Sequence, residues 1–195
     1  QLQSSAVKQY AETQGLPVLQ PIKLKDPAFA EELRLYKPDL QVIVAFRMLP
    51  EVVWNLPPLG TFNLHGSLLP NYRGAAPIHW AVINGETETG VTTFFLQHEI
   101  DTGDLLFQET EPIHPDDTTG DVYERLMKRG AKLVVKTAEA IQAGTTNPVP
   151  QDETAAMKPA PKLTRATGEI HWSKTGAEIY NLVRGMYPFP GSHTT

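Results

Sequence analysis

One segment constrains the fold of this chain more than any other. Residues 40–46 read Leu-Gln-Val-Ile-Val-Ala-Phe, an almost unbroken apolar run that is rich in β-branched side chains. Such a run predicts a strand that is covered on both faces, as in a parallel α/β sheet. A short helix is expected over 50–55 and a second strand over 60–65. This alternation predicts an α/β fold with a Rossmann-like, doubly wound and mainly parallel sheet.

Local signals place the remaining elements. The pair Asp26-Pro27 provides an N-cap and a proline at the first helical position, which together start a helix. Residues 148–164 carry four prolines, which predicts a linker before a new unit. The expected helices are 4–14, 26–36, 75–84, 118–143 and 173–185, and the further strands are 90–96 and 104–111.

Composition excludes several classes of function. The 195 residues include no cysteine, which excludes a disulfide scaffold, a thiolate zinc site and a cysteine nucleophile. The formal net charge of −5 argues against a general nucleic-acid binder. No apolar run approaches the roughly 18 residues of a membrane span, so we expect no membrane partner. The histidines at 65, 79, 98, 114, 171 and 193 show no paired metal spacing, so we expect no metal site.

Two polar clusters have residue types suited to catalysis. Asn63 and His65 lie two residues apart at the end of an expected strand, so their side chains share one face. The second cluster, at 98–104, contains Asp101. Taken singly, each is better explained structurally, as a satisfied strand end and as an acidic turn. Together, an amide donor for an oxyanion and a histidine oriented by a carboxylate suit acyl transfer onto an amine.

The residues around these clusters resemble the folate-dependent formyltransferases. The resemblance rests on Asn63-Leu-His-Gly-Ser-Leu-Leu-Pro70, on Tyr72-Arg-Gly-Ala-Ala-Pro-Ile78 and on Ile100-Asp-Thr-Gly103. Within the family, Arg73-Gly-Ala-Ala-Pro77 and the stretch 163–191 are similar to the branch whose acceptor is methionyl initiator tRNA. The resemblance covers nearly the whole chain and implies the formyltransferase fold.

The resemblance also implies a reaction and its residues. Formyl is expected to pass from 10-formyltetrahydrofolate to the amino group of methionine on the initiator tRNA, for translation initiation. Asn63 and protonated His65 are expected to stabilise the oxyanion, while Asp101 orients and charges His65 and relays protons. The amine attacks directly, so no side-chain nucleophile is needed. The expected folate contacts are Phe46, Arg47, Met48, Leu49, Ser67, Leu68, Leu69, Pro70, His98, Glu99 and Ile100; core packing is the alternative for Met48 and Leu49.

The same resemblance divides the chain. It implies a catalytic domain over 1–147, a linker over 148–164 and, over 165–195, the start of a C-terminal tRNA-binding domain of β-barrel type. It further implies that the first strands and most of the second domain lie outside this chain. We therefore expect this piece alone to be inactive, because its sheet would expose an edge and lack half of its crevice. We expect a monomer that works in the cytoplasm.

Other functions stay open at this point. A formyltransferase that acts on a nucleotide-linked amino sugar keeps the chemistry and changes the acceptor. A formyltetrahydrofolate hydrolase releases formate to water. A non-catalytic folate- or RNA-binding module predicts binding without turnover, and a Rossmann oxidoreductase predicts nicotinamide binding. The Asn, His and Asp set argues against the non-catalytic module, since binding alone does not require it.

A row of basic residues marks one face of the longest expected helix. Its members, at helical spacing, are Arg125, Arg129, Lys132 and Lys136. A solvated surface is the favoured explanation for such a row. Contact with tRNA phosphates is the alternative, and it predicts binding that weakens steeply with salt.

Overall fold

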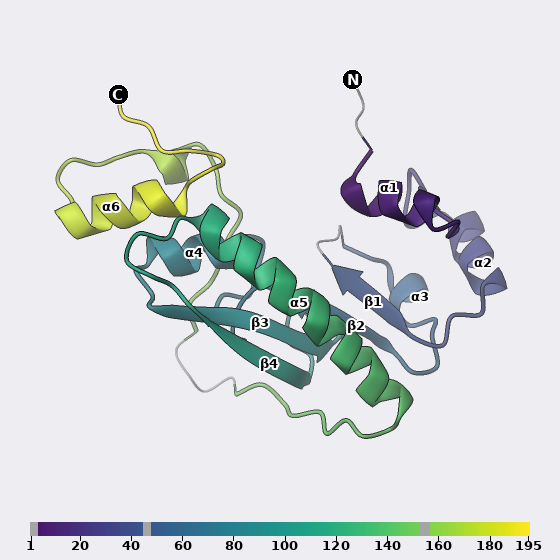
Figure 1. The fold of residues 1–195 in the computed structure, drawn as a ribbon. Coiled ribbons are helices and arrows are strands. Elements are labelled where there is room, and N and C mark those ends of the chain that lie inside the picture. The colour runs from purple at the N-terminus through teal and green to yellow at the C-terminus, as the bar shows by residue number, and fades with distance from the viewer. Residues whose placement is uncertain (1–3, 45–47, 153–156) are drawn as a thin grey trace.

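The computed structural model describes residues 4–44, 48–152 and 157–195 of the chain (Figure 1). Its helices are α1 (Ala6–Thr13), α2 (Pro27–Leu35), α3 (Glu51–Trp54), α4 (Pro77–Ile83), α5 (Thr119–Gln142) and α6 (Gly176–Gly185), with a short 3-10 turn at Ala166–Gly168. Its strands are β1 (Gln41–Val44), β2 (Thr61–His65), β3 (Glu88–Phe95) and β4 (Leu105–Pro112). The helices and strands expected from the sequence are confirmed, most of them a few residues shorter than expected.

The described strands form one mixed sheet in the order β1-β2-β3-β4. β1 runs parallel to β2, whereas β2 with β3 and β3 with β4 are antiparallel. The Rossmann-like α/β class is confirmed, but the expectation of a mainly parallel sheet is wrong for these four strands. The cause lies in two connections. α4 stands beyond the end of β2, so β3 returns along β2 in the opposite direction, and the loop 96–104 then makes β3 and β4 a hairpin.

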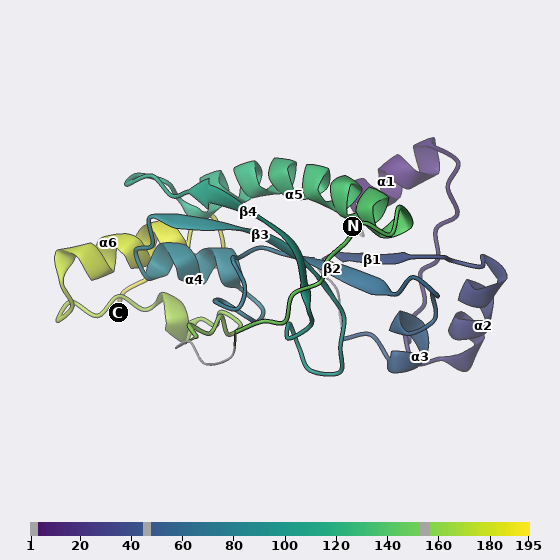
Figure 2. The ribbon, with the colours of Figure 1, turned by 90° about the horizontal axis from the view of Figure 1, so that it is seen from below.

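Helices cover the two faces of the sheet unequally. Figure 2 shows α5 along one face, α2 and α3 on the other side near β1, and α4 with α6 at one end. α5 packs on β3 and β4. Ile43 of β1 shares the face of its partner Asn63, away from α5, and is buried. Val42 and Val44 share the other face with Phe62 and Leu64, which α5 covers, yet they are 39 % and 56 % exposed. The prediction that the strand at 40–46 is covered on both faces is wrong for its described residues, because α5 packs mainly on β3 and β4 and leaves Val42 and Val44 of β1 exposed.

The core lies between α5, α4 and the sheet. α5 begins at a capping box. The backbone N–H of Asp121 donates to the Thr118 hydroxyl oxygen, and the backbone N–H of Thr118 donates to the Asp121 carboxylate. Its buried stripe contributes Val122, Leu126 and Leu133, which join residues of α4 and β3 in one cluster. α5 also approaches β2 closely at Gly130, where an added Cβ would lie 2.7 Å from Leu64 Cδ2. This contact fixes the helix over the strand that carries Asn63 and His65.

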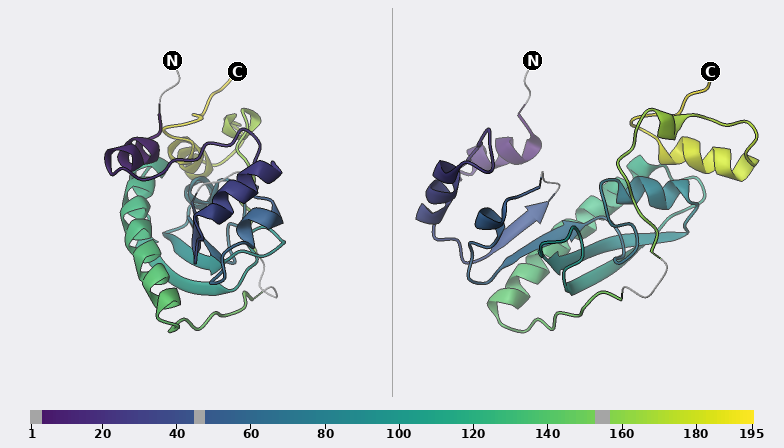
Figure 3. Two further views of the ribbon diagram at one scale, coloured as in Figure 1. Left: turned by 90° about the vertical axis from the view of Figure 1, so that its right-hand side faces the viewer. Right: turned by 180° about the vertical axis from the view of Figure 1, so that it is seen from behind.

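The proline-rich segment predicted as a linker is tied to the rest of the chain at several points. Val149 pairs with Leu105 at the start of β4, and Ala160 pairs with Gly74. Further along, the indole nitrogen of Trp80 donates to the carbonyl oxygen of Pro161 at 2.8 Å. Figure 3 shows the segment, green to yellow-green, running along the sheet from the end of α5 toward α6. Its described residues therefore form a strap across the loops that follow β2.

The C-terminal residues pack against α4 and the start of α5. α6 begins at a second capping box, between Thr175 and Glu178, and lies against α4. Thr119 donates its hydroxyl to the carbonyl oxygen of Gly185 at 2.7 Å. Within the described ranges, no helix is long and apolar enough to cross a membrane.

Candidate active site

Asn63 and His65 project from the same face of β2, as their spacing predicts. β2 lies between β1 and β3, with Asn63 paired to Ile43 and Phe94, so both side chains start from the interior of the sheet. Asn63 is 4 % exposed and His65 is 6 % exposed. The ring of Phe94 meets the His65 imidazole edge to face, with centroids 6.5 Å apart. Both polar groups are therefore largely shielded from water.

The Asn63 amide has an unmet hydrogen-bonding capacity. Its Oδ1 is buried and has no hydrogen-bond partner among the residues that the structure describes. Leaving a buried polar atom unpaired costs about 1–3 kcal/mol, so most buried groups find a partner. The unpaired atom is an acceptor, so the unmet capacity is for an N–H or O–H donor.

The two ring nitrogens of His65 face different groups. Nε2 lies 2.8 Å from the carbonyl oxygen of Tyr72. Because a carbonyl oxygen only accepts, Nε2 carries the proton in this contact. Nδ1 lies 3.8 Å from Oδ2 of Asp101, a side chain that is 9 % exposed. The structure thus brings the three predicted catalytic residues together, with Nδ1 as the ring atom that can accept a proton.

Asp101 reaches His65 from the loop between β3 and β4. Its backbone is left-handed, with φ of +56°, a conformation that costs energy for residues other than glycine. The carboxylate Oδ2 accepts a hydrogen bond of 3.0 Å from the backbone N–H of Gly74. Two residues on, Gly103 leaves no room for a side chain, since an added Cβ would lie 1.7 Å from the carbonyl oxygen of Phe95. The Asp-Thr-Gly sequence is therefore needed to turn this loop inward.

Residues 67–70 form a tightly bonded segment beside the catalytic residues. Ser67 is fully buried and donates its hydroxyl to the carbonyl oxygen of Asn71 at 2.7 Å. Thr92 donates to the Ser67 carbonyl at 2.6 Å and accepts from the Leu69 N–H at 3.2 Å. Ser67 and Leu69 thus fix the segment, whereas Leu68 and Pro70 are partly exposed. As contacts to folate, all four stay predictions.

Most of the other predicted folate contacts that the structure describes lie at the surface. Met48 is 74 % exposed and Ile100 is 64 % exposed, so core packing does not explain Met48. His98 and Glu99 are exposed as well, and Leu49 is half-buried. Phe46 and Arg47 lie outside the described residues. As ligands of folate, these residues also stay predictions.

His98 and Glu99 line a hollow of about 500 Å³ beside the Asp101 loop. His98 Nε2 lies 3.5 Å from Glu51 Oε1, and its ring meets Trp54 edge to face at 5.4 Å. His98 therefore faces α3 and stands apart from the catalytic group. The lining residues are Glu51, Trp54, Asn55, Leu96, Gln97, His98, Glu99 and Thr102.

Three groups that hold the site were missed by the sequence reasoning. The Tyr72 carbonyl and the Gly74 N–H are backbone groups of the Tyr-Arg-Gly stretch, which was noticed only as a family motif. Gln151 donates to the carbonyl oxygens of Asp101 and Gly103 from a proline-rich segment that was expected to be a plain linker. Backbone contacts and long-range side-chain contacts leave no periodic signal in a sequence.

A second, partly exposed network stabilises the Tyr72 turn. The Tyr72 hydroxyl donates to Glu86, and Lys158 forms an ion pair with the same carboxylate. Burial, and then the bond to Glu86, raise the pKa of the Tyr72 phenol well above its usual range. Burial alone would raise the pKa of Glu86, but the bonds from Lys158 and Tyr72 outweigh it and lower that pKa. Tyr72 therefore stays a neutral donor, and Glu86 stays charged.

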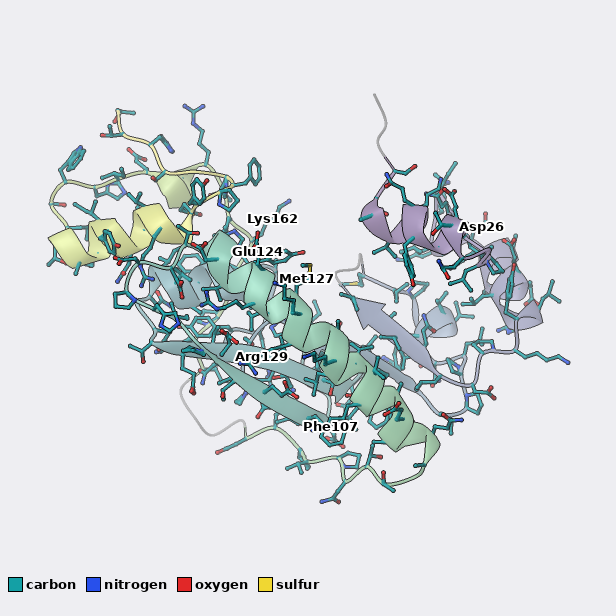
Figure 4. All side chains as sticks on the ribbon, viewed as in Figure 1. Asp26, Phe107, Glu124, Met127, Arg129 and Lys162 are labelled. Carbon is teal, nitrogen blue, oxygen red and sulfur yellow. The ribbon has the colours of Figure 1, made fainter. Side chains whose placement is uncertain are left out.

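The basic row on α5 is largely occupied by neighbouring acidic and aromatic groups. Arg125 bonds to Glu111 at 2.6 Å and to Asp117 at 2.5 Å. Arg129 also pairs with Glu111, and Lys136 lies 4.8 Å from the ring centre of Phe107. Figure 4 labels Arg129 and Phe107 at the seam between α5 and β4. These contacts favour a structural role for most of the row over phosphate binding.

No group of three or more histidine, aspartate or glutamate side chains in the described ranges is placed to hold a metal ion. The site instead combines an open amide, an imidazole and a carboxylate at the end of a sheet strand. No serine or cysteine nucleophile takes part in this group, so it suits direct attack by a substrate amine. Residue types in this arrangement are suited to the transfer of a small acyl group onto an amine.

The chain belongs to the formyl transferase family. The family model described as "Formyl transferase" matches residues 1–138, and that described as "Formyl transferase, C-terminal domain" matches residues 162–195. A protein of Parabacteroides distasonis named "Methionyl-tRNA formyltransferase" is 58 % identical over 99 % of this chain. One of the same name from Azobacteroides pseudotrichonymphae is 57 % identical over 98 % of it. The chain spans 61 % and 60 % of the length of these two curated relatives.

Solved structures support the same fold. HypX from Aquifex aeolicus in complex with tetrahydrofolic acid matches 85 % of this chain and 29 % of its own, at a TM-score of 0.72 and 25 % identity. A 4-N formyltransferase from Francisella tularensis matches 97 % of this chain and 76 % of its own, at a TM-score of 0.76 and 22 % identity. The second likeness, at this identity, concerns the fold alone.

Proposed function

We propose that this chain is the catalytic part of an enzyme that transfers a formyl group from 10-formyltetrahydrofolate to the amino group of methionyl initiator tRNA. The observation that carries the proposal is the His65 imidazole, which faces Asp101 at 3.8 Å and shares one face of β2 with the Asn63 amide. This arrangement fits an acyl transfer in which the substrate amine is the nucleophile.

The names of the relatives support the choice of acceptor. Proteins that are 56–58 % identical to this chain are named for methionyl-tRNA. The formylated tRNA would serve translation initiation, which places the enzyme in the cytoplasm. We propose that it acts as a monomer.

Asn63 is proposed to stabilise the charge that develops during the reaction. When the amine nitrogen attacks the formyl carbon, a C–N bond forms and the carbonyl oxygen becomes an oxyanion. The NH2 group of the Asn63 amide is the donor for that oxygen, and the side chain shares one face of β2 with His65. A preorganised donor of this kind typically accelerates such a step by about 100- to 1,000-fold.

His65 and Asp101 are proposed to move the protons. Nδ1 of His65 takes the proton that the attacking amine loses, and the Asp101 carboxylate stabilises the imidazolium that results. The imidazolium adds to the stabilisation of the oxyanion. His65 then gives the proton to N10 of the folate as the bond from N10 to the formyl carbon breaks. The products are the N-formyl amide and tetrahydrofolate, and His65 is neutral again.

The folate is proposed to lie along the 67–70 segment and the hollow beside the Asp101 loop. Leu68 and Pro70 are the partly exposed members of a segment that is otherwise rigidly bonded. The hollow is lined by Trp54 and by several polar residues, among them Thr102, which follows Asp101 in the chain. Flat heterocycles favour sites that combine such an apolar wall with a few fixed polar groups.

The chain is proposed to divide into a catalytic domain over 1–147, a connecting segment over 148–164 and the beginning of a tRNA-binding domain over 165–195. The match of a separate C-terminal family model to residues 162–195 supports the second boundary. In this division the strap that crosses the catalytic loops is the connection between the two domains.

One assay tests the proposal against its nearest rivals. The intact protein is given 10-formyltetrahydrofolate and either charged initiator tRNA or a nucleotide-linked amino sugar. Formylation of the tRNA alone is expected. Formylation of the sugar alone would assign the chain to the sugar branch, and formate release without any acceptor would make it a hydrolase.

A further inference from the structure

Gln151 has the most fully used side chain near the site. Its Oε1 accepts two hydrogen bonds from Arg73, at 3.1 Å from Nε and 2.6 Å from Nη2. Its Nε2 donates to the carbonyl oxygens of Asp101 at 2.9 Å and Gly103 at 2.8 Å. The residue is 8 % exposed, so these bonds are shielded from water. A buried amide that makes four hydrogen bonds holds its neighbours in a fixed geometry.

The two donated bonds hold the loop that presents the catalytic carboxylate. They reach the carbonyls on either side of Thr102, at the point where Asp101 has a φ of +56°. Backbone in this region persists only when the surrounding structure enforces it. Gln151 is itself anchored, since Val149 pairs with Leu105 at 2.8 Å and 3.0 Å. The strap therefore fixes the direction in which Asp101 points.

The two accepted bonds hold the opposite loop. Arg73 lies between Tyr72, whose carbonyl bonds to His65 Nε2, and Gly74, whose N–H bonds to the Asp101 carboxylate. The loops at 71–74 and 101–103 thus meet directly where the Gly74 N–H donates to Asp101. Gln151 bridges them a second time, between Arg73 and the carbonyls of Asp101 and Gly103.

We infer that Gln151 is a positioning residue for the transfer reaction, which it serves by locking the Asp101 loop to the Tyr72–Gly74 loop through Arg73. The inference rests on the proposed function. It assigns no contact with substrate to Gln151. Its effect passes through the distance between Asp101 and His65, and that distance governs turnover more than substrate binding.

The decisive variant is Gln151→Glu in the intact protein. The introduced carboxylate still accepts from Arg73, which keeps the strap in place. Its second oxygen replaces the donating Nε2, however, and so lies against the carbonyl oxygens of Asp101 and Gly103. The matched control is Gln142→Glu, the same change at an exposed position at the end of α5. Arg73→Lys is the second variant, because an ammonium group cannot reproduce the paired donation of the guanidinium. If Gln151→Glu does not fold, Arg73→Lys tests the positioning role in its place.

Two readouts are measured together, namely steady-state kinetics and the exchange rate of the Gly74 amide proton. In Gln151→Glu we expect kcat to fall by about 10- to 100-fold, with both KM values within about threefold of the parent. We expect the Gly74 amide, which bonds to Asp101, to exchange at least about tenfold faster. The Leu69 amide, which bonds to Thr92, should keep its rate.

The outcomes separate this inference from the proposed function. An unchanged Gly74 exchange rate overturns the inference, as does a normal kcat or a loss confined to KM. If the parent protein formylates no acceptor, the proposed function fails. The Gly74 exchange rate then still decides whether Gln151 positions Asp101.

Discussion

The Nε2–H of His65 donates to the carbonyl oxygen of Tyr72, and Tyr72 offers that oxygen from a left-handed backbone with φ of +62°. The turn that presents the carbonyl is buried and bonded through its own phenol to Glu86. This contact fixes the proton on Nε2 and leaves Nδ1 toward Asp101. The role of each ring nitrogen of His65 therefore follows from the position of a backbone carbonyl, which the residue types in the sequence do not reveal.

Replacing His65 by glutamine tests that assignment. The glutamine Nε2 can still donate to a carbonyl oxygen, but no atom of the amide takes up a proton near neutral pH. We expect kcat to fall by about 100-fold or more, with little change in the melting temperature. The exposed His114→Gln is the matched control and should keep full turnover. A near-normal rate in His65→Gln would remove His65 from the mechanism.

Replacing Asp101 by asparagine tests whether the pair works as a unit. Asparagine tolerates the left-handed backbone as aspartate does, and its Oδ1 can still accept from the Gly74 N–H. We expect a loss of about 100-fold in kcat, because the imidazolium loses its counter-charge. Groups that act together give non-additive losses, so the double variant with His65→Gln should be little slower than either single one. If the kcat of the double variant falls by the product of the two single losses, the two residues act independently. The exposed Asp39→Asn is the control.

Replacing Asn63 by alanine tests whether its amide serves the reaction or the fold. Because Oδ1 has no partner among the described residues, its removal relieves a cost of about 1–3 kcal/mol that offsets the small cavity left behind. We expect the free energy of unfolding to stay within about 1 kcal/mol while kcat falls by about 100- to 1,000-fold. Denaturant titration and initial rates give the two values, with the exposed Asn147→Ala as control. A large loss of stability with modest loss of rate would point to a structural role.

Much of this arrangement could be predicted from the sequence, for identifiable reasons. The order of strands and helices follows from apolar periodicity, and the juxtaposition of Asn63 and His65 follows from the two-residue repeat of a strand. The antiparallel return of β3 could not be predicted, since it depends on where α4 packs rather than on the residues of β3. The exposure of Val42 and Val44 depends in the same way on which helices reach β1.

Contacts through the backbone and across long separations were equally hidden. Gln151 lies 50 residues from Asp101 along the chain, and its neighbouring prolines indicate a linker when read alone. Arg125 and Arg129 form a basic row in the sequence, yet the acidic residues that neutralise them come from β4 and the turn before α5. Periodicity shows which side chains share one face of a helix or strand. Whether that face is solvated, paired or buried depends on residues from elsewhere in the chain.

Replacing Gly103 by alanine tests the steric requirement of the Asp101 loop. The added Cβ would lie 1.7 Å from the Phe95 carbonyl oxygen, so the β3–β4 loop must shift. We expect a loss of about 2 kcal/mol or more in the free energy of unfolding, together with a lower kcat. Gly176→Ala is the matched control, because no heavy atom lies within 4 Å of its added Cβ. In that helix the change should be neutral or stabilising by up to about 1 kcal/mol. Equal effects at the two glycines would contradict this account.

The ion pairs beneath α5 predict how stability depends on pH. Burial would raise the pKa of Glu111, but the bonds from Arg129 and Arg125 outweigh it and hold that pKa below its usual 4.5. A carboxyl whose pKa is lower in the folded state stabilises the fold above its unfolded pKa, and this contribution is lost as the pH falls through the folded value. We therefore expect Glu111→Gln to be less stable than the parent near neutral pH, by about 1–3 kcal/mol. The difference should shrink steadily below about pH 4.5. Urea titrations across this range, with exposed Glu88→Gln as control, measure it. A difference that does not vary with pH would mean that Glu111 acts through packing alone.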